Sequence, residues 1–174
     1  TDLGEVLRRD PTHAQAALTR ATVLSVMGRP HDAKPDCDVV VARAHPIVGA
    51  TCHAALAGLV GKNGDGIALI TAALQASPPP GLAAWALGTR GELHQRNGDV
   101  ALAEADYRAA LALAPGDGWT TAALADLLLD SARGPEVAAL VGASDADNLV
   151  LRRALGRAAT TGLSDADQAA LDQD

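Results

Sequence analysis

The 174-residue sequence is poor in aromatic residues. It has no phenylalanine, one tyrosine and two tryptophans, so aromatic residues make up 2% of a chain that is 48% hydrophobic. The apolar share is mostly alanine, leucine and valine. A β-sheet core needs more β-branched and aromatic residues, whereas alanine favours helices and lets their axes approach closely. The composition therefore favours closely packed helices.

Long apolar runs and excess positive charge are also absent. No apolar run approaches the roughly 20 residues that a membrane-spanning helix needs, and no signal peptide is visible, so we expect no membrane insertion. The net charge of −7 leaves no basic face for phosphates, so nucleic acid is not an expected partner. Because the sequence opens on Thr1 without an initiator methionine, we expect a fragment or a processed product.

The sequence has two cysteines, Cys37 and Cys52, which are too few for a disulfide framework or a zinc site. They should fall on adjacent helices, where the geometry would allow a disulfide. Cysteine also behaves as a small apolar residue in helical cores. We therefore expect two free buried thiols.

The stretch from Ala84 to Pro115 organises the rest of the chain, because it reads as two helices joined by a tight turn. Gly98 supplies the left-handed residue that ends the first helix, and Asp99 is a good N-cap for the second. The second helix places apolar residues on one face at three- and four-residue spacing. One such hairpin leaves apolar faces uncovered, which predicts copies of itself on either side.

Turn residues and tryptophans recur at a nearly constant interval. Glycine-terminated turns are expected at Gly28, Gly64 and Gly98, which are 36 and 34 residues apart, and two tryptophans are also 34 residues apart. Ala132 stands where a fourth turn glycine belongs. A two-helix unit that repeats every 34 residues predicts a helical array.

The other expected helices cover residues 3–10, 12–27 with Thr12 as N-cap, 48–61, 67–76, 119–129 and 135–141. A helix from Pro30 to about Ala44 contains Pro35, so we expect it to begin late, at Lys34, or to kink. Ser144 is expected to cap a helix over about 145–160, and Ser164 to open a final helix whose acidic face caps the array.

The central unit resembles the tetratricopeptide repeat, whose pattern is W-x2-L-G-x2-Y, then A-x3-F, then P. Gly91, Ala103, Tyr107 and Pro115 match that pattern in spacing, with Leu87 in the tryptophan slot and departures at Arg90 and His94. In the first repeat, Ala21, Leu24 and Ala33 match the pattern, and Cys37 takes the place of its phenylalanine. In the helix expected over about 145–160, Leu155-Gly156 is similar to the L-G pair. The second and fourth repeats match the pattern only in part.

This resemblance implies an all-α superhelix, a solenoid of antiparallel helix hairpins. The expected division is 1–11 (end of a preceding repeat), 12–46, 47–80, 81–115, 116–143 (degenerate) and 144–174 (partial repeat and capping helices).

In tetratricopeptide proteins the first helices line a concave groove that binds an extended or helical peptide. When these positions are carried over to this sequence, the groove of the third and fourth repeats would contain Trp85, Thr89, Glu92, Gln95, Arg96, Trp119, Asp126 and Asp130. The same reasoning places in the groove Gln15, Leu18, Thr22, Ser25 and Val26 of the first repeat, and Thr51, Ala54, Gly58 and Lys62 of the second. Only Lys62 and Arg96 offer positive charge there, so the carboxylate clamp of chaperone-binding relatives is missing. We expect an apolar peptide with one or two basic residues.

The two tryptophans are the strongest candidates for peptide-binding residues, because tryptophan is enriched in binding hot spots. They could instead pack between repeats of an aromatic-poor core. Asp126 and Asp130 lie one turn apart and could form an acid pair, but such pairs are more often a solvated acidic face.

Residue patterns for catalysis are missing from the sequence. The five histidines show no metal-binding spacing, and no nucleophile elbow or phosphate loop is present. We expect no enzyme, no metal and no cofactor, and His94 to be an interior residue.

The sequence thus predicts non-catalytic binding of a protein or peptide. Two alternatives stay open: a structural module that self-associates into homo-oligomers, and the regulatory arm of a larger enzyme outside these residues. High alanine, arginine and glycine content with little lysine suggests a bacterial source, which leaves cytoplasm and periplasm open.

Overall fold

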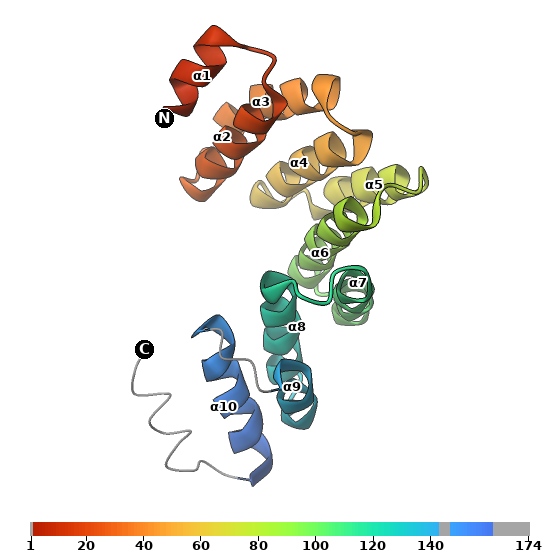
Figure 1. The fold of residues 1–174 in the computed structure, drawn as a ribbon. Helices are drawn as coiled ribbons and strands as arrows, with labels where there is room; N and C mark the ends of the chain where they lie inside the picture. Colours follow the sequence, from red (N-terminus) through yellow and green to blue (C-terminus); the bar gives the residue numbers. More distant parts are fainter. Residues whose placement is uncertain (1, 143–146, 162–174) are drawn as a thin grey trace. The chain divides into compact units, whose positions relative to one another are not determined.

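The computed structural model describes residues 2–142 and 147–161, and these residues form ten helices and no strand (Figure 1). The predicted all-α class is therefore confirmed. The chain divides into two compact units, residues 1–106 and 107–174, with the boundary inside the helix α7. None of the described helices is long and apolar enough to cross a membrane.

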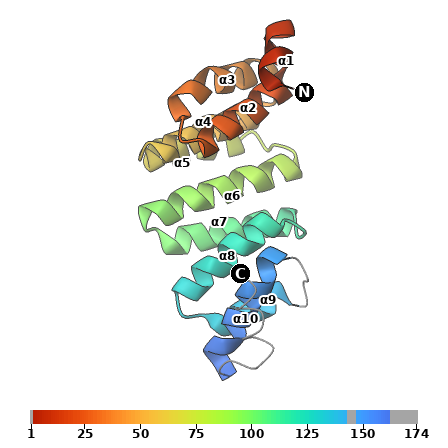
Figure 2. The same cartoon turned by 90° about the vertical axis from the view of Figure 1, so that its left-hand side faces the viewer.

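The first unit is a series of helices in which each packs against the next. It contains α1 (Leu3–Arg9), α2 (Ala14–Val26), α3 (Pro30–Arg43), α4 (Pro46–Leu59), α5 (Asn63–Leu74), α6 (Pro80–Asn97) and the beginning of α7 (Val100–Leu113). The alternate helices α2 and α4, and α4 and α6, also contact each other. Figure 2 shows α2, α4 and α6 side by side on one face of this unit, with α3 and α5 behind them.

The second unit holds the rest of α7, then α8 (Gly118–Asp130), α9 (Gly134–Val141) and α10 (Asp147–Thr161). The last three helices contact one another in all pairs. Ser144, Ser164 and the acidic tail, on which we expected caps and a final helix, lie outside the described residues.

The turns after α2, α4, α6 and α8 have the same backbone form. Each has one residue with positive φ, Gly28 (71°), Gly61 (77°), Gly98 (84°) or Ala132 (57°). In each, the amide of the next residue donates to the carbonyl five residues back, as from Arg29 to Leu24 and from Arg133 to Leu128, both at 2.8 Å. These are Schellman caps, in which a left-handed residue lets two otherwise unpaired carbonyls accept hydrogen bonds.

Three local expectations were wrong. The turn after α4 uses Gly61 instead of Gly64, which lies inside α5, so the turn glycines are 33 and 37 residues apart. The helix α3 begins at Pro30 and continues through Pro35, so the start at Lys34, one of the two outcomes expected, is wrong. The N-cap of α2 is His13, whose Nδ1 accepts from the amide of Ala16.

Small residues fill the core. Ala17, Ala33, Ala54 and Ala86 are fully buried, and Tyr107 is the largest of the fully buried side chains described. Close approach of α3 and α4 depends on Gly49, since a Cβ atom there would lie 2.8 Å from the Cα of Val41. The alanine-rich composition is thus used for short distances between helix axes.

The two cysteines form a disulfide that joins α3 to α4, with a Cα–Cα distance of 5.6 Å. This overturns the expectation of free thiols. Both sulfurs lie in a buried cluster with Ala21, Ala33 and Leu56. The bridge therefore links the second helix of one hairpin to the first helix of the next.

Candidate functional site

An apolar hollow of about 240 Å³ lies on the face of the first unit formed by α2, α4 and α6. Trp85 and Leu82 of α6 form one side of it, and Gln15 and Leu18 of α2 another. Ala14 of α2, Val48 of α4 and two residues at the end of α3 complete the lining. Its volume is below the roughly 300 Å³ at which small-molecule sites begin, so it suits one or two side chains of a partner.

Trp85 is 39% exposed, although it is one of the largest apolar side chains of the chain. It lies one and a half turns into α6, which begins at Pro80, and its neighbours Ala84 and Ala86 are buried. Its carbonyl accepts a hydrogen bond from Thr89 Oγ1 at 3.1 Å. Trp85 is therefore held on a rigid helix with its ring at the surface, as a binding side chain needs to be.

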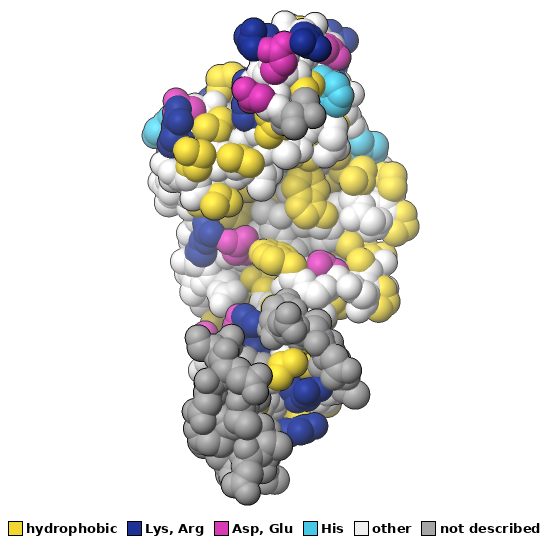
Figure 3. Space-filling model, turned by 60° about the vertical axis from the view of Figure 1, so that its left-hand side comes forward, with side chains coloured by type: hydrophobic (Ala, Val, Ile, Leu, Met, Phe, Trp, Pro, Cys, Tyr) yellow, Lys and Arg dark blue, Asp and Glu magenta, His cyan; other side chains and the backbone are white. Residues whose placement is uncertain are grey.

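The space-filling view shows the chemical character of this face (Figure 3). On the first unit, hydrophobic side chains are exposed among uncharged ones, and both positive and negative side chains lie between them. The surface around the hollow is therefore mixed in character, with apolar, polar and charged side chains.

The other predicted residues of α6 have different surroundings. Thr89 is buried, so its side chain supports the helix and offers little surface. Glu92 and Arg96 form an ion pair with each other, one turn apart, and Gln95 is half-buried. Their charges are thus partly satisfied within the helix.

The predicted groove residues in the second compact unit, residues 107–174, also differ in their surroundings. Trp119 is 52% exposed at the start of α8. Asp126 accepts two hydrogen bonds from Arg152 of α10, both 2.6 Å long, and Asp130 is exposed at the end of α8. Asp126 therefore fastens α10 to α8 and does not form an acid pair with Asp130.

Most of the groove residues predicted in the second repeat, residues 47–80, were placed on the wrong face of α4. Thr51, Ala54 and Gly58 are buried, and only Lys62 of that set is exposed. This error has one cause, since placing the turn at Gly64 assigned the wrong face of α4 to the groove. In the first repeat, where the turn was placed correctly, Gln15 and Leu18 line the hollow, whereas Thr22, Ser25 and Val26 do not.

Paired arginine and aspartate side chains hold two of the hairpins together. Arg90 of α6 donates to both carboxylate oxygens of Asp106 in α7, at 2.8 and 2.6 Å, and Arg20 of α2 does the same to Asp36 of α3, at 2.7 and 2.5 Å. These hydrogen bonds raise the pKa of Arg90 and of Arg20, against a smaller effect of burial. The departure from the repeat pattern at Arg90 is thus a structural ion pair.

His94 is an interior residue, as expected, with 13% of its side chain exposed. Its Nδ1 lies 3.6 Å from Asp99, and its Nε2 lies 3.9 Å from Asp106. Among the residues that the structure describes, no three His, Cys, Asp or Glu side chains come close enough to hold a metal ion.

A second, larger hollow among the described residues was missed by the sequence reasoning. It lies between α3 and α5 over α4 and has a volume of about 690 Å³. Lys62 is the only one of the sequence-predicted groove residues that lines it. A signal was present in the exposed apolar positions Val60 and Leu69, but these were assigned to no surface.

No known protein family matches this sequence, and no curated protein is similar to it at a significant level. The functional argument therefore depends on the geometry of these surfaces.

Proposed function

We propose that the chain is a non-catalytic peptide-binding protein, built as a tetratricopeptide-like superhelix, whose ligand contacts the face formed by α2, α4 and α6. The observation that carries the proposal is Trp85, held at the surface beside an apolar hollow lined by residues of α2, α4 and α6 and of the end of α3. Recurring Schellman turns and contacts between alternate helices support the repeat architecture.

The hollow favours an apolar anchor in the ligand. Its lining residues include no charged side chain, and Gln15 is its one polar residue. A partner leucine or aromatic side chain in this hollow would bury apolar surface against the indole, and burial of one such side chain contributes about 2 kcal/mol. Basic residues beside the anchor would suit a chain of net charge −7.

The test uses the two tryptophans as separate reporters. A Trp119→Phe variant keeps Trp85 as its only indole, and it is used to select binders from a displayed library of random linear peptides. A selected peptide is then titrated while Trp85 emission is recorded. We expect a saturable change in emission, and binding that is at least about tenfold weaker in Trp85→Ala, as at other tryptophan hot spots.

The matched control is Trp119→Ala, which removes an equally large exposed indole from the second unit. Circular dichroism first establishes that all variants are folded. Peptides that bind Trp85→Ala as tightly as the parent protein would remove this face as the site. Loss of binding in Trp119→Ala alone would move the site to α8.

Self-association is the second candidate function, and one observation favours it. Val23, Val26 and Met27 are exposed at the end of α2, with Val26 86% accessible. Sedimentation velocity over a range of concentrations separates the two proposals. A dimer that dissociates in Val26→Asp would support self-association, and a monomer at all concentrations would exclude it.

A further inference from the structure

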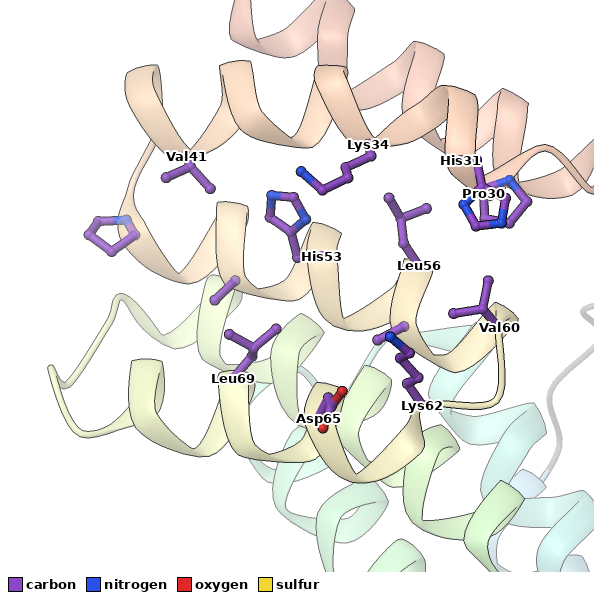
Figure 4. A pocket seen from close by; sticks show the side chains of 13 residues that line it. Pro30, His31, Lys34, Val41, His53, Leu56, Val60, Lys62, Asp65 and Leu69 are labelled. Atoms are coloured by element: carbon purple, nitrogen blue, oxygen red, sulfur yellow. The ribbon is translucent and has the colours of Figure 1, made fainter.

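The large hollow is an elongated groove with α4 as its floor and α3 and α5 as its walls (Figure 4). Its lining extends along α4 from Pro46 to Val60, a rise of about 21 Å. The groove and the Trp85 hollow lie on different sides of α4. Val48 faces the hollow, whereas Ala50 and His53 face the groove.

The groove lies in the α4–α5 hairpin, which lacks the arginine–aspartate bridge of its two neighbours. Arg20 and Arg90 stand eight residues before their turn glycines, and their aspartate partners stand eight residues after. The same positions around Gly61 are His53 and Leu69, and both line the groove. Where the α2–α3 and α6–α7 hairpins have an ion pair, this hairpin therefore offers an imidazole and an exposed leucine.

Polarity changes along the length of the groove. At one end the lining is apolar, with Val41, Pro46 and Leu69, and at the other His31 and Lys62 stand beside Val60 (Figure 4). Both lysines of the chain, Lys34 and Lys62, line this one groove.

Of the two lysines that line the groove, one is not paired with a carboxylate. Lys34 Nζ lies 3.3 Å from Asp38, which also lies 3.0 Å from His53 Nε2, so Lys34 is already paired. Lys62 makes no ion pair with any other described residue, and Asp65 stands one turn further along α5. Lys62 is also the N-cap of α5, whose first amides receive no side-chain cap and add partial positive charge.

From this juxtaposition we propose that the groove binds a single-chain amphiphile with an anionic head group. The head group contacts Lys62, and the hydrocarbon chain lies along α4 toward Val41, Pro46 and Leu69. The lining supplies what each part of such a molecule needs, an unpaired ammonium group at one end and apolar side chains toward the other, over a total length of about 21 Å.

Volume favours an acyl chain over a helical peptide. A helix of that length with its side chains occupies roughly 2,000 Å³, so only about one third of it would lie inside the 690 Å³ of the groove. The groove volume falls in the range of roughly 300 to 1,000 Å³ that is usual for small-molecule sites. A free fatty acid and a lysophospholipid share the required chemistry.

Binding is tested with the full chain and palmitate, measured by displacement of a dansyl-labelled fatty acid below the micelle concentration. Hexadecanol and hexadecyltrimethylammonium have the same chain with no charge and with positive charge. We expect saturable binding of palmitate, with hexadecanol weaker and the cation weakest. Lysophosphatidic acid and lysophosphatidylcholine then separate a fatty-acid site from a lysolipid site.

Two substitutions address the two ends of the groove. Leu69→Asp places a charge in the apolar wall and should weaken palmitate binding by about tenfold or more. Lys62→Glu should weaken palmitate but leave hexadecanol unchanged. Their matched controls are Leu102→Asp, an exposed leucine of α7 outside the groove, and Arg43→Glu, an exposed cation outside it.

Amide chemical shifts of the unsubstituted protein provide a second measurement that does not depend on folding of a variant. Palmitate should shift the resonances of α3, α4 and α5 along the groove and leave those around Trp85 unchanged. Absence of saturable binding, equal loss in the control variants, or shifts confined to other helices would each overturn the proposal. So would groove-dependent binding of an acidic amphipathic peptide without binding of palmitate. Because this readout is separate from Trp85, its failure is distinguishable from failure of the proposed peptide site.

Discussion

The guanidinium of Arg90 donates two parallel hydrogen bonds to the carboxylate of Asp106, and the same pair occurs 70 positions earlier as Arg20 and Asp36. In both hairpins the arginine is on the first helix and the aspartate is nearly fully buried on the second. A third bond, from Arg90 Nη1 to Thr71 Oγ1 at 3.0 Å, reaches back to α5. The bridge therefore closes a hairpin and also ties it to the preceding one.

Replacing Arg90 by methionine should lower the free energy of unfolding by about 3 kcal/mol, because it leaves the buried Asp106 without its partner. Arg20→Met should cost less, since the Arg20 side chain is 39% exposed and that of Arg90 is 20%. Urea unfolding measures both. The double variant Arg90→Met/Asp106→Leu should recover most of the loss, and a double variant no more stable than Arg90→Met would contradict the bridge.

Substitution of Ala132 by glycine should stabilise the second unit by about 1 kcal/mol, because alanine is strained at its φ of 57°. Trp119 fluorescence during urea unfolding follows that unit, in a Trp85→Phe background that removes the other indole. Gly98→Ala makes the reverse change at an equivalent turn and should destabilise the first unit by a similar amount. Destabilisation by Ala132→Gly would show that the turn does not have the left-handed conformation.

Reduction of the Cys37–Cys52 disulfide should lower stability by about 3 kcal/mol, since the bridge closes a loop with a sequence separation of 15 residues. Thermal unfolding with and without dithiothreitol measures the difference, and the Cys37→Ala/Cys52→Ala variant serves as a control that should not respond to the reductant. Thiol titration of the unfolded, unreduced protein should detect no free thiol. Two thiols per chain would contradict the bridge.

Two glycines in successive helices should respond to alanine in opposite directions. Gly49→Ala should destabilise the protein by about 1–3 kcal/mol, because its Cβ would lie 2.6 Å from a side-chain carbon of Val41 and 2.8 Å from its Cα. Gly64→Ala adds a methyl group in open space inside α5 and should stabilise it by up to about 1 kcal/mol. Calorimetry distinguishes them, and equal effects would disprove the close contact of α3 with α4.

The sequence predicted the helical class and the hairpin around Gly98 because these depend on local signals. Asn97-Gly98-Asp99 combines a left-handed C′ glycine with an N-cap, and no competing turn lies nearby. Around Gly61 and Gly64 two glycines compete, and the local sequence does not decide between them. Burial decides, because the start at Asn63 places Gly66 and Ile70 in the core.

The errors at the candidate sites have a related origin. Trp85 was found from its chemistry, but the hollow beside it needs side chains from four helices, and the groove of Lys62 and Leu69 needs three. The disulfide was missed because cysteine also fits a small apolar slot, and only the 5.6 Å separation of the two Cα atoms distinguishes the two states. Distances between helices are not encoded in any single segment.

The disulfide also determines how the chain responds to force. It connects neighbouring hairpins and shields the residues between Cys37 and Cys52 from extension when the two ends are pulled apart. Those residues would otherwise add a contour length of about 45 Å. In a force-extension experiment the oxidised protein is therefore shorter by that length when fully stretched, and α3 stays attached to α4 at Cys37 while the bridge is intact. A covalent link across the junction of two hairpins makes that junction the last in the first unit to separate under load.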